Sequence, residues 1–326
     1  MHHLPIHEIM RKNQCDETRC SMDQFGIRVG LEKKDAFEGW FCKVDDRKND
    51  LMFSVIWGYT THEETRHAFL QFTSSLDQKT SYIRYPIEDF SFEKDPFVLR
   101  IGKNCLSEKE MVLDFILNGN PVKGTFIFTA FTPIQTSFLK PGIMGWLTHF
   151  PNECNHAIIS MNHEVSGNLM IGERNWSMQQ ASGYVEKDWG TGFPREYVWV
   201  QANDWKESSV VFSYATVPVL GKHAKGFFLV LHHEGKEYRF SSIEGSRMRH
   251  FKVRRDAFVA VLSKGGYKVL IRARQAHPIA LASPKGGEMK AKIKESLDGR
   301  VEVLLWRGKK QLAHLKTSRG SIDVHE

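Results

Sequence analysis

The sequence lacks the signatures of several protein classes. Its 326 residues include only five cysteines, an odd number, with no Cys-x-x-Cys pair. This argues against a disulfide framework and against a zinc motif. No apolar run approaches the roughly 18 residues of a membrane span. The chain also has no glycine-rich nucleotide-binding motif and no P-loop. We therefore expect a cytoplasmic protein that requires no metal and no organic cofactor.

Negative charge is scarce in the last third of the chain. Residues 221–326 hold 23 Lys and Arg against 10 Asp and Glu, a net charge of +13, whereas the whole chain carries +7. A basic region can face nucleic acid, an anionic membrane or an anionic ligand. However, "RMRHFKVRR" (247–255) alternates charged and apolar residues, as a half-solvated strand does. No nucleic-acid motif accompanies it, so we expect no nucleic-acid partner.

Helix signals are also few, whereas short segments that alternate with a period of two recur throughout the chain. Many short strands of this kind predict an all-β sandwich or barrel architecture. The length predicts two domains, residues 1–175 and 176–326, with the boundary within the polar stretch 165–180. The predicted strands include 51–58, 67–73, 111–117, 124–131, 196–203, 209–217, 226–233, 267–274 and 300–306.

The segment "GYVEKDWGTGFP" (183–194) combines carboxylates, an ammonium group and aromatic rings within twelve residues. On a strand, Tyr184, Glu186 and Asp188 would project from one face, and Lys187 from the other. Two buried carboxyls so close cannot both ionise cheaply, so the pKa of one should rise. A carboxyl that stays protonated in an apolar cavity is a proton donor.

Neighbouring strands offer polar and aromatic groups on single faces. Such a row suits a wall that contacts a ligand. The alternative is structural: the Glu-Lys-Asp row could be an ion-pair network between two domains, and the tryptophans could belong to the core. Spacing alone leaves both interpretations open. The rows are Tyr197, Trp199, Gln201 and Asn203 in one strand, and His67, Phe69 and Gln71 in another.

Several long blocks resemble the tocopherol cyclase family. They are residues 141–167 and 181–203, with shorter matches at 38–44 and 67–72. The blocks follow the order of the family and cover roughly the first two-thirds of the chain. A more distant similarity is to carotenoid hydratases. The resemblance implies two lipocalin-like antiparallel β-barrels packed side by side, with the 183–194 segment near their junction.

The resemblance also implies a chemistry. Tocopherol cyclase protonates a double bond of a prenylated hydroquinone, and the phenol oxygen closes on the resulting cation. The related hydratases capture such a cation with water. Neither reaction needs a metal, a nucleotide or a flavin. By position, Glu186 and Asp188 are the acid candidates, with Tyr184 as a hydrogen-bond partner.

The remaining site residues follow from the same resemblance and from the strand faces. Aromatic rings stabilise a cation without trapping it, and a polar group must orient the incoming oxygen. Lys187, on the opposite face, is expected to form an interdomain ion pair. The candidates are Trp40, Trp189 and Trp199 as cation stabilisers, His67, His156, Gln201 and Asn203 as polar groups, and Phe69, Gln71, Trp146 and Tyr197 as further ligand contacts.

Three functions compete at this stage. The first is an isoprenoid-quinol cyclase or hydratase, and the second is a non-catalytic carrier of a hydrophobic molecule in a barrel interior. The third is a structural protein with filled barrels. The carboxyl-bearing face favours the first, because a carrier of neutral lipid gains little from buried acids. The apolar segment "PGIMGWLTHF" (141–150) predicts either a core contact or transient contact with a membrane surface for loading a lipid.

Overall fold

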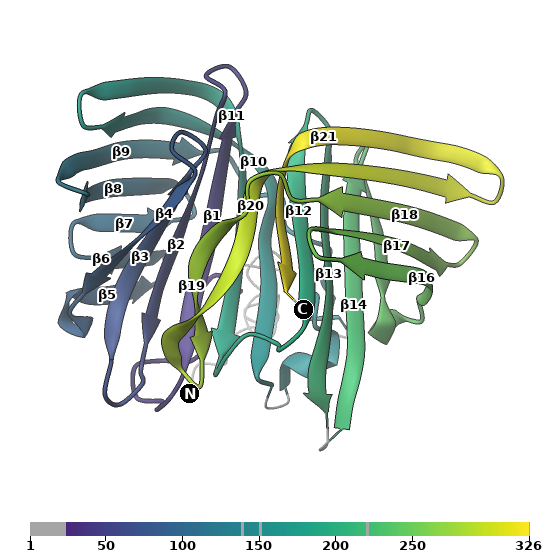
Figure 1. Cartoon of the computed structure of the whole chain (residues 1–326), viewed down its shortest axis with the longest axis horizontal. Helices are drawn as coiled ribbons and strands as arrows, with labels where there is room; N and C mark the ends of the chain where they lie inside the picture. Colours follow the sequence, from purple (N-terminus) through teal and green to yellow (C-terminus); the bar gives the residue numbers. More distant parts are fainter. Residues whose placement is uncertain (1–23, 138–139, 150–151, 220–221, 326) are drawn as a thin grey trace, which may run out of the picture.

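The structure, a computed structural model, describes residues 24–325 except 138–139, 150–151 and 220–221. Most of these residues lie in two large antiparallel sheets, which stand side by side in Figure 1. The strong alternation of the sequence is the reason, since it favours strands that bury one face. The all-β prediction is therefore confirmed.

The first sheet has the order β4-β3-β2-β1-β11-β10-β9-β8-β7-β6-β5. Its short strands β5–β9 run across its long strands in Figure 1, so the sheet curls around its own interior. Its strands are β1 (Phe37–Asp46), β2 (Leu51–Thr60), β3 (His67–Ser74), β4 (Lys79–Tyr85), β5 (Phe90–Lys94), β6 (Phe97–Ile101), β7 (Asn104–Ser107), β8 (Glu110–Leu117), β9 (Asn120–Phe128), β10 (Cys154–Ile171) and β11 (Arg174–Gly190).

The second sheet has the order β15-β14-β13-β12-β21-β20-β18-β17-β16, with β19 paired to β20. It curls in the same way (Figure 1). Its strands are β12 (Tyr197–Trp205), β13 (Ser208–Val219), β14 (Lys222–His233), β15 (Lys236–Ser241), β16 (Arg247–Arg254), β17 (Ala257–Lys264), β18 (Tyr267–Arg274), β19 (Ile279–Lys285), β20 (Glu288–Arg307) and β21 (Lys310–His325). Three short 3-10 helices accompany the sheets in the described residues: η2 (Ile87–Asp89), η3 (Gly145–His149) and η4 (Ser242–Glu244).

Each curled sheet encloses its own packed core. The first core includes Trp57 and Phe126, which are fully buried and come from the two halves of the first sheet. The second core includes Phe212 and Val303 in the same arrangement. The chain thus forms two lipocalin-like barrels whose interiors are filled with side chains. A third apolar cluster, which includes Phe41 and Trp199, lies between the barrels.

The passage from one barrel to the other falls at residues 191–196, between β11 and β12. The sequence placed the boundary at 165–180. That polar stretch instead forms the end of the β10–β11 hairpin, with Gly167 opposite Met178 and a turn at Gly172. A solvent-exposed hairpin end has the composition of a linker, although the strands on both sides belong to one sheet.

The basic segment 247–255 contains β16, whose residues alternate between partly buried and exposed positions. This confirms the prediction of a half-solvated strand. The cysteines Cys42, Cys105 and Cys154 are free thiols, and Cys15 and Cys20 lie outside the described residues. Among the helices of the described residues, none has the length and apolar character needed to cross a membrane.

Candidate active site between the barrels

Strand β11 has charged side chains on both of its faces. Lys187 points into the first barrel, where its ammonium group lies 2.6 Å from the carboxylate of Glu38. The rings of Trp40 and Trp189 lie 5.0 and 5.1 Å from the same ammonium group. Both partners of this ion pair are fully buried. The prediction of an interdomain ion pair for Lys187 is therefore wrong, because its partner belongs to the same barrel.

The opposite face of β11 carries Tyr184, Glu186 and Asp188, as the alternation predicts. Tyr184 donates a hydrogen bond of 2.5 Å to Glu186 Oε2, and Trp199 Nε1 donates one of 3.1 Å to the same oxygen. His156 on β10 places its Nδ1 atom 2.8 Å from Asp188 Oδ1. Its Nε2 is 3.5 Å from Glu186 Oε2, without hydrogen-bond geometry. One histidine thus connects the two carboxyls.

The protonation of this cluster follows from burial and charge. Burial raises the pKa of Glu186 to about 7, against the lowering effect of the neighbouring His156. Burial alone would lower the pKa of His156, but the charges of Asp188 and Glu186 raise it to about 9. Near neutral pH the cluster therefore holds an imidazolium and a carboxyl that is partly protonated. Because Glu186 Oε2 already accepts two hydrogen bonds, the proton of Glu186 belongs on Oε1.

An apolar cavity lies between the barrels, and the cluster forms part of its wall. Glu186, Asp188 and His156 line it. Trp199 and Phe41 meet edge to face with ring centroids 5.6 Å apart, and Phe228 stacks on His156 at 5.4 Å. The aromatic residues of the lining include Phe37, Phe41, Phe69, Phe193, Trp199 and Phe228. Carboxyls in such surroundings are the arrangement that the sequence motif suggested.

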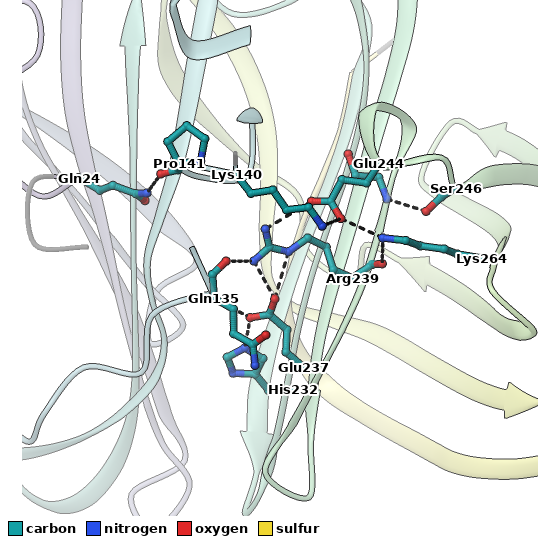
Figure 2. A network of polar contacts seen from close by, with 11 residues as sticks. Gln24, Gln135, Lys140, Pro141, His232, Glu237, Arg239, Glu244, Ser246 and Lys264 are labelled. Carbon is teal, nitrogen blue, oxygen red and sulfur yellow. Dashed lines mark hydrogen bonds and ion pairs between the residues drawn. The ribbon is translucent and has the colours of Figure 1, made fainter. Parts of the chain in front are cut away.

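The connection between β9 and β10 covers one side of the cavity and contributes Ile143, Met144 and Leu147 to its lining. Gln24 Nε2 donates a hydrogen bond of 2.6 Å to the carbonyl oxygen of Pro141. Figure 2 shows how the same connection is held on the side of the second barrel.

On that side, Glu237 accepts a hydrogen bond of 2.7 Å from the backbone N–H of Gln135, and Arg239 contacts the Gln135 carbonyl oxygen. Lys140 lies 3.2 Å from Glu244, which also binds Lys264 at 2.9 Å (Figure 2). Glu237, Arg239 and Glu244 are largely buried, whereas Lys140 is about half exposed. These contacts fix the cover of the cavity to the second barrel.

The second barrel adds two acids that sequence reasoning missed. Glu295 on β20 and Asp323 on β21 line the cavity and are 3% and 7% exposed. Burial raises the pKa of Asp323 well above its ordinary value, against a hydrogen bond of 3.3 Å from Tyr197. Burial and the charge of Asp323 raise the pKa of Glu295 likewise. The two acids lie on different strands, and only the pairing of β20 with β21 brings them together.

The other predicted site residues divide into two groups. Phe69, Tyr197 and Trp199 line the cavity, together with Glu186, Asp188 and His156. Tyr184 lies behind Glu186 as its hydrogen-bond donor. The residues of the second group do not line the cavity in the part of the chain that the structure describes.

Among that group, Trp40 and Trp189 surround Lys187 inside the first barrel, because even and odd positions of a strand face opposite sides. Gln201 accepts a hydrogen bond of 3.3 Å from Lys43, and Asn203 donates one of 2.8 Å to the Gly183 carbonyl oxygen. These two amides share a face with Trp199, yet they join the barrels beyond the end of the cavity.

Three further predicted residues are also not part of the cavity lining. His67 binds Tyr82 at 2.6 Å and the carbonyl oxygen of Thr65. Gln71 joins the barrels by accepting a hydrogen bond of 2.9 Å from the backbone N–H of Ala282. Trp146, on η3, is 55% exposed. His67 therefore bonds within its own barrel, Gln71 joins the two barrels, and Trp146 lies at the surface.

His156, Glu186 and Asp188 offer ligand atoms within 4.8 Å of one another, a spacing that could hold a metal ion. Nδ1 of His156 is bonded to Asp188, and Oε2 of Glu186 accepts two hydrogen bonds. His156 Nε2 is left without a hydrogen-bond partner among the described residues. The raised pKa of His156 keeps the imidazole protonated, and a metal ligand must lose that proton, so the arrangement fits proton chemistry better than metal binding.

Comparison with known proteins gives a consistent family. The model of the tocopherol cyclase-like family matches residues 132–325. A chloroplastic tocopherol cyclase of Zea mays is 33% identical over 234 residues, which cover 65% of this chain and 45% of the maize protein. A probable tocopherol cyclase of Oryza sativa is 34% identical over 107 residues, 29% of this chain and 22% of the rice protein. The chain thus spans less than half the length of these relatives.

Solved structures support the fold. A crystal structure of an AttH protein of Nitrosomonas europaea aligns with a TM-score of 0.52 at 12% identity, covering 89% of this chain and 92% of the other. Kievitone hydratase of Nectria haematococca aligns with a TM-score of 0.51 at 8% identity, covering 88% of each chain. At such identities the likeness concerns the two-barrel architecture alone.

Proposed function

The chain belongs to the tocopherol cyclase-like family, and on this premise we propose that it protonates an isoprenoid double bond without a cofactor, leading to cyclisation or hydration. The observation that carries the proposal is Glu186. It is a buried carboxyl with a pKa of about 7 on the wall of an aromatic cavity. A carboxyl of this kind can hold a proton at neutral pH and release it to a substrate.

The proposed reaction uses the two sides of Glu186. The proton on Oε1 moves to one carbon of the double bond, whose π electrons form the new C–H bond and leave a tertiary cation. Trp199 and Phe41 present rings to this cation. The hydroxyl oxygen of the same molecule, or water, then forms the C–O bond. The proton released from that oxygen replaces the one that Glu186 gave up, so no proton is consumed overall.

The remaining groups adjust the acid. Tyr184 and Trp199 donate to Oε2 and stabilise the carboxylate left after proton transfer. His156, held by Asp188, supplies a positive charge 3.5 Å away that favours the same state. These partners keep the pKa of Glu186 from rising further. A pKa near the working pH is the optimum for general acid catalysis.

The proposed ligand is a long, mainly apolar molecule with one polar end, such as a prenylated quinol. The apolar lining between the barrels supports this class, whereas the barrel interiors are filled by their own cores. The sequence suggested a ligand inside a barrel. We propose instead that the ligand binds between the two barrels. Trp146, exposed beside the cavity-lining Met144 and Leu147, supports transient contact with a membrane surface during loading.

The alternative function is non-catalytic binding of a hydrophobic molecule, for which the apolar lining would be sufficient. Deuterium labelling separates the two functions. The purified protein is incubated with a prenylated hydroquinone in D2O, and the product is analysed by mass spectrometry. We expect one carbon-bound deuterium, together with an isomeric mass for cyclisation or an added water for hydration. Tight binding without any deuterium on carbon would leave the carrier function.

A further inference from the structure

Glu295 and Asp323, from the second barrel, form a second acidic site on the cavity wall. They are directly paired across β20 and β21, and Asp323 is in turn paired with Trp199 across β21 and β12. Directly opposed residues of antiparallel strands project from the same face, with Cβ atoms roughly 5 Å apart. All three side chains line the cavity.

These two acids differ from Glu38 and Asp45, which are also deeply buried. Glu38 has the ammonium group of Lys187 at 2.6 Å, and Asp45 has the guanidinium group of Arg319 at 2.7 Å. Neither Glu295 nor Asp323 has an ion-pair partner within the described part of the chain. Lys43 is the nearest cation that influences Glu295, but its ammonium group donates to Gln201 and to the Arg319 carbonyl oxygen.

Two carboxyl oxygens are also left without hydrogen bonds. Tyr197 donates to Asp323 Oδ2, while Asp323 Oδ1 and Glu295 Oε1 have no hydrogen-bond partner among the described residues. Leaving a buried polar atom unpaired costs about 1–3 kcal/mol. Such atoms on the wall of a cavity indicate that a ligand supplies the missing donor.

The protonation of the pair sets what it can bind. Two adjacent buried carboxyls cannot both be charged cheaply, so at least one of them holds a proton. The pair then offers an O–H donor and several acceptor lone pairs. This combination matches a hydroxyl group, which is itself both donor and acceptor.

We propose that the Glu295–Asp323 pair is the subsite that binds the phenolic hydroxyl of the ligand, an inference that deepens the function proposed above. Trp199 lies between the two acidic sites, since it pairs with Asp323 and donates to Glu186. The hydroxyl is thereby held on one side of Trp199 and the proton donor on the other. The reacting double bond lies between them, over the ring that stabilises the cation.

A hydroxyl fits this subsite better than an organic cation does. His156, whose pKa is raised to about 9 by its carboxylate neighbours, already places an imidazolium on the cavity wall. The charges of Glu186 and Asp188 also act on Asp323. A neutral phenol satisfies the unpaired oxygens without burying a further charge.

The test uses ligands that cannot react, so that it does not depend on catalysis. Binding of 4-octylphenol, its methyl ether 4-octylanisole and octylamine, which is protonated at neutral pH, is measured by calorimetry on the full chain. A hydrogen bond to a charged group contributes about 1.5–3 kcal/mol. We therefore expect the phenol to bind about 10- to 100-fold more tightly than the ether.

The variants Asp323→Leu and Glu295→Met remove one carboxyl each at similar volume and should abolish most of this preference. Glu295→Met should not lower the melting temperature, because an unpaired buried acid is removed. Asp323→Leu also removes the acceptor of the Tyr197 hydroxyl, so its folding is checked by its melting curve. Glu234→Gln, at a side chain that is 75% exposed, is the matched control and should keep the preference. Binding of the ether should be equal in all four proteins.

The outcomes separate this inference from the proposed function. If the preference for the phenol disappears in the variants while the wild-type protein labels no carbon with deuterium, the subsite stands and the proposed function fails. If the wild-type protein binds phenol and ether equally, or binds neither, the subsite is refuted whatever the labelling shows. A preference that survives both substitutions also refutes it. Tighter binding of a protonated octylamine than of the phenol would make the pair a cation site instead.

Discussion

The two faces of β11 differ in how their buried charged groups are neutralised. On the face inside the first barrel, the charge of Lys187 is cancelled by Glu38, which also accepts bonds from Tyr59 and from the backbone N–H groups of Arg28 and Val29. This pair is completely buried and fully bonded.

On the face between the barrels, burial raises the pKa of Glu186, and the cavity provides space beside it. Charges in aromatic surroundings are therefore not in themselves a functional signal. We infer a structural role from the full pairing of Lys187 with Glu38, and we propose a functional one for Glu186 because it is an incompletely neutralised acid on a cavity wall.

The largest effect should come from the cavity face. Glu186→Gln keeps the shape of the side chain but removes the transferable proton, so turnover should fall by about 10²- to 10⁴-fold. Ligand affinity and melting temperature should change little. Turnover, binding and melting are measured on the same preparation, with the exposed Glu164→Gln on β10 as the control. Normal turnover by the Gln variant would show that the acid lies elsewhere.

The opposite result is expected inside the first barrel. Lys187→Met leaves Glu38 charged, buried and unpaired, which should lower the free energy of unfolding by about 3–5 kcal/mol. The protein that remains folded should keep its turnover per molecule. Adding Glu38→Gln should recover part of the stability, measured by urea denaturation. A Lys187→Met variant with normal stability but no turnover would reverse the comparison between the two faces.

The pH dependence of turnover and of stability should reflect the protonation of Glu186 on the cavity face. Because the acid form of Glu186 is the proposed donor and its pKa is about 7, kcat should fall about tenfold per pH unit above that value. Stability follows the same sign: a raised carboxyl pKa favours the folded state at low pH, and this contribution is lost as the pH rises through about 7. Rate and melting profiles between pH 5 and 9 check both statements, and a rate that rises across this range would contradict the assignment.

A smaller shift should follow from Tyr184→Phe. The phenol hydroxyl stabilises the ionised form of Glu186, so its removal should raise the pKa of that group. One hydrogen bond contributes about 0.5–1.5 kcal/mol, which corresponds to roughly half to one pH unit. The alkaline limb of the rate profile should therefore move to higher pH. An unchanged limb would mean that another group controls it.

The smallest effect is expected from metal removal. Although His156, Glu186 and Asp188 have a spacing that could hold an ion, the imidazolium of His156 would have to lose its proton before it could bind a metal. Dialysis against EDTA should leave turnover unchanged, and elemental analysis should find no stoichiometric transition metal. A loss of activity that Zn²⁺ restores would assign the cluster to metal chemistry.

Local sequence determined the strands and much of one wall of the site. The segments around 51–58, 67–73 and 267–274 form strands β2, β3 and β18, because alternation with a period of two is a local property. The same alternation put Tyr184, Glu186 and Asp188 on one face of β11 and Lys187 on the other. The segment 165–180 misled the domain prediction because a hairpin end exposed to water has the composition of a linker.

Tertiary structure decided which faces meet. Trp40 and Trp189 were grouped with Trp199 by residue type, yet the barrel wall separates them, since inside and outside of a curled sheet alternate residue by residue. Glu295 and Asp323 lie 28 positions apart in the sequence, and only the register of β20 with β21 makes them neighbours. Periodicity fixes the side of a strand on which a residue lies. The partner across a cavity depends on strand pairing and on the packing of two barrels, which no local pattern encodes.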